Sequence, residues 1–283
     1  MNPRSNNPDH HQDEQRLQWD RVADAWKQWW PVIENGARGV SERMLELARI
    51  GPGQRVLDIA TGIGEPALLA AGRVGPAGQV VATDLSARML DIARERAQAL
   101  GLTNVAFIEA DAERLDFPDG GFDAIVWRWG PSDLSNPSDA LATIRRLLRP
   151  AGAFAAAVWE AGPRARPLAS LANDVARDMF ALPSDCAAEP TPPTESLESR
   201  MRGAGFSEVR AEEVALSLEF ASADDCTRYL VEVSPAFAEL LSDKSPAQRA
   251  EFRHRLTERL QPYVQADGRV RIADVTLCVV GQA

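Results

Sequence analysis

Short apolar runs alternate with helix-forming segments from Gln54 to Trp159, and this alternation leaves few folds open to the chain. It is typical of parallel strands that are joined by crossover helices. In such a sheet helices cover both faces, and a ligand binds beyond the carboxyl ends of the strands, where the strand order reverses. We therefore expect a doubly wound α/β core with strands at 56–59, 80–83, 105–108, 122–127 and 153–159.

The segments outside this core differ from it in composition and indicate the domain organisation. The first residues are polar, which predicts disorder, whereas tryptophans recur at helical spacing from Trp19 until Pro31 ends that run. A second helix is expected from Ala37 to Ile50. The expected division is a disordered tail at 1–16, an N-terminal helical cap at 17–53, the core at 54–160, a lid insertion with a connecting helix at 161–206, and C-terminal strands with a helical cap of two helices at 207–283.

The composition argues against several classes of protein. Asp and Glu outnumber Lys and Arg by 41 to 31, and the formal charge of -10 disfavours binding to nucleic acid. No apolar run approaches the roughly 20 residues that cross a bilayer, and the polar start lacks a secretion signal, which favours a cytoplasmic protein without stable membrane insertion. The 3 cysteines are scattered and predict no metal site. Arginine supplies nearly all of the positive charge, which suggests a GC-rich bacterial genome.

A turn that contains two glycines follows the first expected strand, in the sequence Asp58-Ile59-Ala60-Thr61-Gly62-Ile63-Gly64-Glu65. Glycines let the backbone turn tightly and approach a ligand closely. Asp84 ends the next strand, where a carboxylate can accept hydrogen bonds from both hydroxyls of a ribose. Any nucleoside-binding fold shares these features, and the stretch from Gly62 to Ala67 also fits the G-x-G-x-x-A pattern of dinucleotide-binding proteins. An NAD(P)-dependent oxidoreductase is therefore one alternative.

Two residues of this turn favour a cation over a diphosphate. Asp58 places a carboxylate at the end of the strand, where it would repel a pyrophosphate and attract the cationic amino group of S-adenosylmethionine (SAM). Pro66 removes one of the backbone N–H donors that the start of a helix offers to a phosphate.

In the order of these motifs the chain resembles the class I SAM-dependent methyltransferases. Within that family it is similar to the bacterial ubiquinone/menaquinone C-methyltransferase group. Val56 to Pro66 is similar to the first motif of the family, with Ala60 where many members have glycine, and Thr83 to Ser86 is similar to the second. Glu109 to Glu113 resembles the third motif, and Leu147 to Pro150 resembles the helix end before the fifth strand. The resemblance implies a Rossmann-like, doubly wound, mostly parallel sheet of seven strands with an antiparallel last strand, a helical N-terminal cap and a lid.

The resemblance also implies SAM as the methyl donor, S-adenosylhomocysteine (SAH) as the product, and a set of cofactor contacts. Gly62 and Gly64 would underlie the methionine portion, and Asp84 would bind the ribose. Leu85 and Met89 would cover the adenine face. Asp111 and Ala112 would lie at the adenine edge, and Trp127 at the amino acid end. The full set of implied contacts is Asp58, Ala60, Gly62, Gly64, Asp84, Leu85, Met89, Asp111, Ala112 and Trp127.

The acceptor site follows less directly from the resemblance, because the stretch from Trp127 to Asp133 departs from the apolar run that is common in relatives. The chain lacks the Asn/Asp-Pro-Pro-Tyr and Pro-Cys motifs of enzymes that methylate nucleic acids. We therefore expect O- or C-methylation of a small acceptor that is apolar or aromatic. Trp26, Trp30 and Trp129 are the predicted acceptor contacts, since indole rings can face a flat molecule or a sulfonium, although tryptophans at helical spacing also fit a core.

The chemistry of methyl transfer requires few side chains, because the methyl carbon is already activated and positioning supplies much of the acceleration. Asp133, Glu160 and His254 are conceivable general bases, but surface solvation or helix packing explains each of them better, and the catalytic residues stay unassigned. A protein that binds SAM without catalysis is a second alternative. A homodimer is compatible with the sequence.

Overall fold

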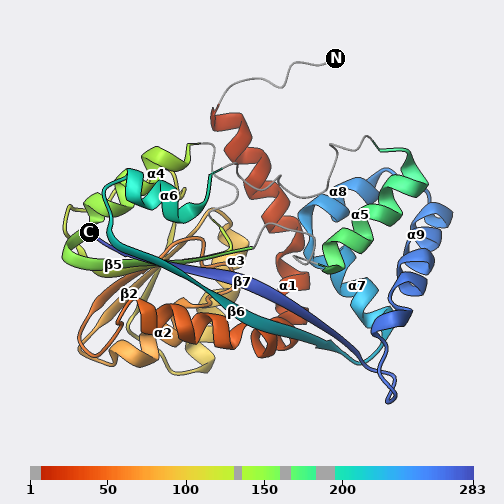
Figure 1. Cartoon of the computed structure of the whole chain (residues 1–283), viewed down its shortest axis with the longest axis horizontal. Helices are drawn as coiled ribbons and strands as arrows, with labels where there is room; N and C mark the ends of the chain where they lie inside the picture. Colours follow the sequence, from red (N-terminus) through yellow and green to blue (C-terminus); the bar gives the residue numbers. More distant parts are fainter. Residues whose placement is uncertain (1–7, 131–135, 160–166, 183–194) are drawn as a thin grey trace.

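The computed structural model describes residues 8–130, 136–159, 167–182 and 195–283, and a seven-stranded sheet forms its centre (Figure 1). The strand order is β3-β2-β1-β4-β5-β7-β6. β7 runs antiparallel to both of its neighbours, whereas the other neighbouring pairs are parallel. The predicted fold class is thus confirmed. The strands are β1 (Arg55–Asp58), β2 (Gln79–Asp84), β3 (Val105–Glu109), β4 (Phe122–Arg128), β5 (Leu148–Trp159), β6 (Ser207–Phe220) and β7 (Val270–Gln282).

The central strands carry runs of apolar residues because both faces of the sheet are covered. In β1, Val56 packs toward α2 (Ala67–Val74) and the C-terminal half of α1 (Pro8–Leu47). Its neighbour Leu57 packs toward the opposite face, which α4 (Pro137–Leu147) and α6 (Leu197–Gly203) cover. Successive side chains of a strand point to opposite faces, so a strand that is buried on both faces has apolar residues at consecutive positions.

Helix α1 is continuous over 40 residues, which differs from the predicted tail at 1–16 and the predicted break at Pro31. Pro31 cannot donate to the carbonyl of Lys27, but both residues are exposed, so water can hydrate the free carbonyl. On the buried side, Trp29 and Ile33 pack into one hydrophobic cluster from either side of the proline. Tertiary packing therefore outweighs the local penalty. Residues 1–7 lie outside the described residues.

Helix α3 (Ala87–Ala99) follows β2 and packs against the first half of α1. Ser86 caps its start by accepting a hydrogen bond from the N–H of Met89 at 3.0 Å. Met89 and Ile92 on α3 meet Val22 and Ala23 on α1 in a small hydrophobic cluster. This cluster holds the N-terminal half of α1 over the carboxyl ends of the strands.

A second group of helices lies beside the sheet, on the other side of α1 (Figure 1). It consists of α5 (Pro167–Phe180), α7 (Ala223–Val233), α8 (Pro235–Ser242) and α9 (Pro246–Arg259). Helix α5 falls within the predicted lid, and it packs through Leu168 and Val175 into the cluster that holds Phe252 of α9. Within that predicted segment, 161–166 and 183–194 lie outside the described residues.

Three α-helices and a short 3-10 helix (Gln261–Tyr263) separate β6 from β7, where the sequence predicted two helices. The additional boundary falls at Ser234, whose hydroxyl accepts a hydrogen bond from the N–H of Phe237 at 3.4 Å, with Pro235 at the first helical position. Both features are strong signals for the start of a helix. The predicted single helix from about 223 to 241 is therefore two helices.

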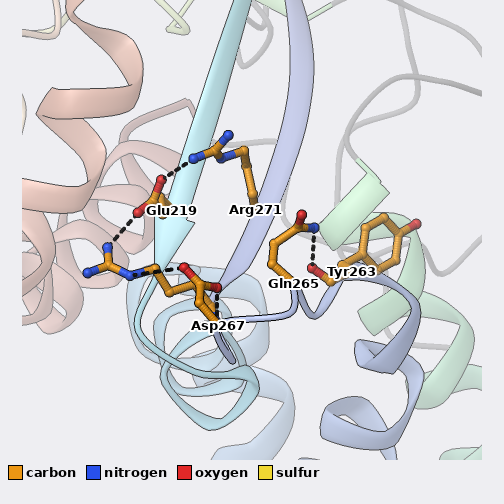
Figure 2. Close-up of polar contacts among 6 residues, drawn as sticks. Glu219, Tyr263, Gln265, Asp267 and Arg271 are labelled. Carbon is orange, nitrogen blue, oxygen red and sulfur yellow. Dashed lines mark hydrogen bonds and ion pairs between the residues drawn. The ribbon is translucent and has the colours of Figure 1, made fainter.

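Strands β6 and β7 form a long antiparallel pair that connects the sheet to this second group of helices (Figure 1). At its far end Glu219 accepts hydrogen bonds from Arg269 at 2.5 Å and from Arg271 at 2.8 Å (Figure 2). These side chains are exposed, so the ion pairs contribute little to stability. The connection depends mainly on backbone pairing between the two strands, which continues to Phe220 opposite Val270.

Candidate functional site

A cavity of about 380 Å³ lies at the carboxyl ends of the first four strands. Residues 60–63 and 65 line it after β1, 84–85 after β2, 110–114 after β3 and 127–130 at the end of β4. Helix α1 covers it with side chains from 12 to 34. The cavity is therefore at the reversal of strand order between β1 and β4, where a doubly wound sheet binds its ligand.

Most of the residues predicted to contact a ligand line this one cavity. The lining includes Ala60, Gly62, Asp84, Leu85, Met89, Asp111, Ala112 and Trp127 from the predicted cofactor set, and Trp26, Trp30 and Trp129 from the predicted acceptor set. Asp58 and Gly64 are not among the lining residues. The structure thus brings the two predicted sets together in a single space, while two cofactor positions lie behind its wall.

Asp58 lies behind the turn, so the predicted direct contact with a ligand does not match its position. The residue is 0% exposed. Its Oδ2 accepts hydrogen bonds from Thr61 Oγ1 at 2.6 Å and from the N–H of Ala67 at 2.9 Å. Burial raises the pKa of Asp58 to about 7, and Oδ1 has no hydrogen-bond partner in the described part of the chain. Asp58 therefore holds the turn in shape.

The two glycines of the turn have different roles. Gly62 has a φ of 57°, and a Cβ at this position would meet nothing within 4 Å, so the backbone is open toward the cavity. Gly64 has a φ of 103°, and a Cβ there would approach Leu68 and Ala93 to between 3.0 and 3.2 Å. Gly64 is thus required for close packing of α2 and α3, and Gly62 leaves room for a ligand. Ala60 also adopts the left-handed region, with a φ of 51°, where glycine would be unstrained.

Asp84 is the buried carboxylate that faces the cavity. It is 8% exposed, and its oxygens accept hydrogen bonds from the N–H of Gly62 at 2.7 Å and of Ser86 at 2.9 Å. Burial raises the pKa of Asp84 to about 6, while these backbone donors oppose the shift. A carboxylate has about four acceptor sites, so both oxygens can still accept hydrogen bonds from a ligand.

The first turns of α1 reach the residues that follow β3. The side chain of Gln12 donates a hydrogen bond to Oδ2 of Asp111, and Oδ1 of Asp111 accepts one from the N–H of Glu113 at 2.9 Å. The carboxylate that was predicted at the adenine edge is thus also bonded to α1. Sequence reasoning missed this contact because residues 1–16 were predicted to be disordered.

The tryptophans around the cavity are held in fixed positions. Trp129 stacks on Trp159 with ring centroids 4.6 Å apart, and its Nε1 donates to Thr276 Oγ1 at 3.0 Å. Trp26 donates from Nε1 to the carbonyl of Val233 at 3.0 Å and meets Trp19 edge to face at 6.1 Å. Ring contacts and hydrogen bonds therefore orient two of the indole rings that line the cavity.

Six charged residues of the lining were not among the predicted contacts: Glu34, Glu65, Arg96, Glu113, Arg114 and Arg128. Glu65 pairs with Arg96 at 3.0 Å, and the guanidinium of Arg96 lies 3.9 Å from the centre of the Trp30 ring. Burial is the main cause of the raised pKa of Glu65, and the charge of Glu34 adds to it. The spacing of Trp26, Trp30 and Glu34 by four residues would have revealed Glu34, but the predicted break at Pro31 hid this periodicity.

Of the three conceivable general bases, His254 is the one that lies within the described residues, and it does not line the cavity. Asp133 and Glu160 lie outside the described residues. His254 is on α9, its side chain is 67% exposed, and it lies 3.4 Å from Glu258. In the described ranges no group of three or more His, Cys, Asp or Glu side chains could hold a metal ion.

Comparison with known proteins identifies the family. Residues 56–152 match the family described as Methyltransferase domain (Methyltransf_25). A ubiquinone/menaquinone biosynthesis C-methyltransferase of Ectopseudomonas oleovorans is 37% identical over 115 residues, which cover 40% of this chain and 68% of that protein. The chain belongs to the class I SAM-dependent methyltransferases.

Other relatives of this methyltransferase match a smaller share of their own length. The ubiquinone/menaquinone biosynthesis C-methyltransferase of Pseudomonas savastanoi pv. phaseolicola is 43% identical over 101 residues, 35% of this chain and 40% of that protein. Among solved structures, the phosphoethanolamine N-methyltransferase 2 of Haemonchus contortus in complex with SAM is 22% identical, with a TM-score of 0.51. The match covers 85% of this chain and 52% of that chain, and at this identity it supports the fold alone.

Three features of the cavity lining could receive a nucleoside ligand. Gly62 leaves its backbone open to the cavity, and Asp84 presents a buried carboxylate with free acceptor sites. Leu85 and Met89 add an apolar surface beside them.

None of the described helices combines the length and the apolar composition of a membrane-spanning segment.

Proposed function

We propose that this methyltransferase binds SAM along the carboxyl ends of β1, β2 and β3 and methylates an oxygen or carbon atom of a small acceptor with an apolar or aromatic body. The observation that carries this proposal is the shared cavity. Asp84 and Gly62 line it together with Trp26, Trp30 and Trp129, so a cofactor and a flat acceptor would lie in contact.

The residues of the chain would act mainly by positioning. SAM supplies a methyl group that the positive sulfur has already activated for in-line displacement. Asp84 would accept hydrogen bonds from the ribose, and Leu85 and Met89 would pack against the adenine. Trp129, fixed by its stack on Trp159, would hold the acceptor in one orientation. Orientation and exclusion of water can supply up to about 7 to 11 kcal/mol of the acceleration.

A binding experiment tests the cofactor half of the proposal. Isothermal titration with SAH, SAM and NAD(P) should show binding of SAH and SAM in the micromolar range, as is common for cofactors and substrates, and no binding of NAD(P). Binding of NAD(P) without binding of SAH would contradict the proposal and favour an oxidoreductase.

A transfer experiment tests the catalytic half. Purified protein with SAM that carries a labelled methyl group is incubated with phenols, quinols, indoles and arylamines. Labelled product from at least one of these groups is expected. Cofactor binding without transfer to any of them would instead indicate a protein that binds SAM but does not catalyse.

A further inference from the structure

Glu34 is the only acidic side chain that the described part of α1 directs into the cavity, where the other lining residues of this helix are tryptophans, glutamines and Ile33. The residue is 8% exposed, and its Oε2 is buried without a hydrogen-bond partner in the described part of the chain. Trp26 and Trp30 precede it at intervals of four residues, so all three lie on one face of the helix. A buried carboxylate without a partner is costly, which indicates that a ligand supplies the partner.

The neighbouring guanidinium groups are engaged elsewhere. Arg96 donates hydrogen bonds to Glu65 at 3.0 Å and to the carbonyl of Ile63 at 2.5 Å. Arg128 donates to Ser41 Oγ at 2.7 Å and lies 4.8 Å from the centre of the Trp129 ring. No ion pair or hydrogen bond connects either arginine with Glu34 among the residues that the structure describes. Glu34 therefore feels the charge of Arg96 but has no direct ion-pair partner among the described residues.

The charge balance of the described cavity lining points the same way. This part of the lining contains more carboxylates than guanidinium groups, and SAM brings a single net positive charge, so its binding leaves part of the negative surplus unmatched. The carboxylates are Glu34, Glu65, Asp84, Asp111 and Glu113, and the guanidinium groups are Arg96, Arg114 and Arg128.

We infer that the acceptor carries a protonated amine, which Glu34 binds, while Trp26 and Trp30 contact the apolar body of the same molecule. Both the carboxylate and the faces of the tryptophan rings would attract the cation. This inference rests on the proposed function, because it assigns part of the cavity to the acceptor. It narrows the acceptor class to amines with an apolar or aromatic body, whichever atom receives the methyl group.

Binding of matched probes to the SAH-saturated protein tests the inference without turnover. The probes are tryptamine, 3-ethylindole and indole-3-propionate, which share an indole and differ in charge, together with phenethylamine and benzylamine as smaller amines. By isothermal titration, at least one amine should bind at least about tenfold more tightly than 3-ethylindole and indole-3-propionate. The substitution Glu34→Gln should abolish this preference and leave the SAH affinity within about twofold.

The control is Glu14→Gln, which removes the same charge from an exposed position of α1 and should change neither affinity. The inference is wrong if the neutral or the anionic indole binds as well as the amines, or if none of the amines binds at millimolar concentration. It is also wrong if Glu34→Gln weakens SAH as much as the amine, because Glu34 would then contact the cofactor. Failure of SAH to bind the unmodified protein would overturn the proposed function itself.

Discussion

Asp58 and Asp84 end neighbouring strands and are both buried, but their oxygens face different surroundings. Asp58 is bonded to Thr61 and Ala67 inside the turn, whereas Asp84 lines the cavity. The same residue type therefore stabilises the turn at one strand end and offers acceptor sites to a ligand at the next. Sequence spacing predicted the importance of both positions, but it could not predict which of the two faces the cavity.

Removal of the Asp84 carboxylate should weaken cofactor binding. A hydrogen bond to a charged group is worth about 1.5 to 3 kcal/mol, so Asp84→Ala should reduce SAM affinity roughly tenfold to a hundredfold in isothermal titration. Asp91→Ala is the matched control, because it removes an exposed carboxylate from α3 and should leave the affinity unchanged. An unchanged SAM affinity in Asp84→Ala would remove this residue from the site.

The raised pKa of Asp84 predicts a pH dependence of cofactor affinity. Burial raises this pKa to about 6, so the carboxylate is ionised above that pH and protonated below it. A protonated carboxyl group accepts hydrogen bonds less well, and SAH affinity should therefore fall as the pH is lowered from about 7 to about 5. Titration calorimetry of Asp84→Asn over the same range should show a flatter profile. A profile in the unmodified protein that is flat through pH 6 would contradict the assignment.

Helix α1 connects parts of the fold that the sequence presents as separate. Its residues pack against the sheet through Val40 and Met44, against the second helix group through Trp29 and Ile33, and against α3 through Val22. The local signals at Pro31 and in the polar first residues predicted a shorter and interrupted cap. Those signals report local preference alone, and contacts with distant segments decide the length of this helix.

Substitution of two glycines of α1 tests how this helix packs against β6. A Cβ at Gly36 would lie 2.6 Å from Leu218 Cδ2 and 2.7 Å from the carbonyl oxygen of Ser217, whereas a Cβ at Gly39 would meet nothing within 4 Å. Gly36→Ala should lower the free energy of unfolding by about 1 to 3 kcal/mol because the helix must shift. Gly39→Ala should raise it by about 0.5 to 1 kcal/mol because alanine favours the helix. Urea denaturation measures both, and equal effects of the two substitutions would contradict the observed contact.

The whole molecule consists of a sheet core and a second helix group that meet along α1 and the long β6–β7 pair (Figure 1). The core was predictable because strands that are buried on both faces leave uninterrupted apolar runs, such as Val80 to Ala82. The packing of α5 on α9 was not predictable from local patterns, since the two helices are distant in the sequence. Glu34 escaped detection for a related reason, because its role depends on the continuous path of α1 across the cavity.

A crystal structure of the protein with SAH bound is the most direct test of the central claim, which is that the cavity under α1 holds the cofactor. We predict SAH in this cavity, with its ribose hydroxyls hydrogen-bonded to Asp84 and its sulfur exposed to the space that Trp30 and Trp129 line. The claim would be contradicted if SAH were bound elsewhere on the protein, or if it occupied the cavity without any contact to Asp84.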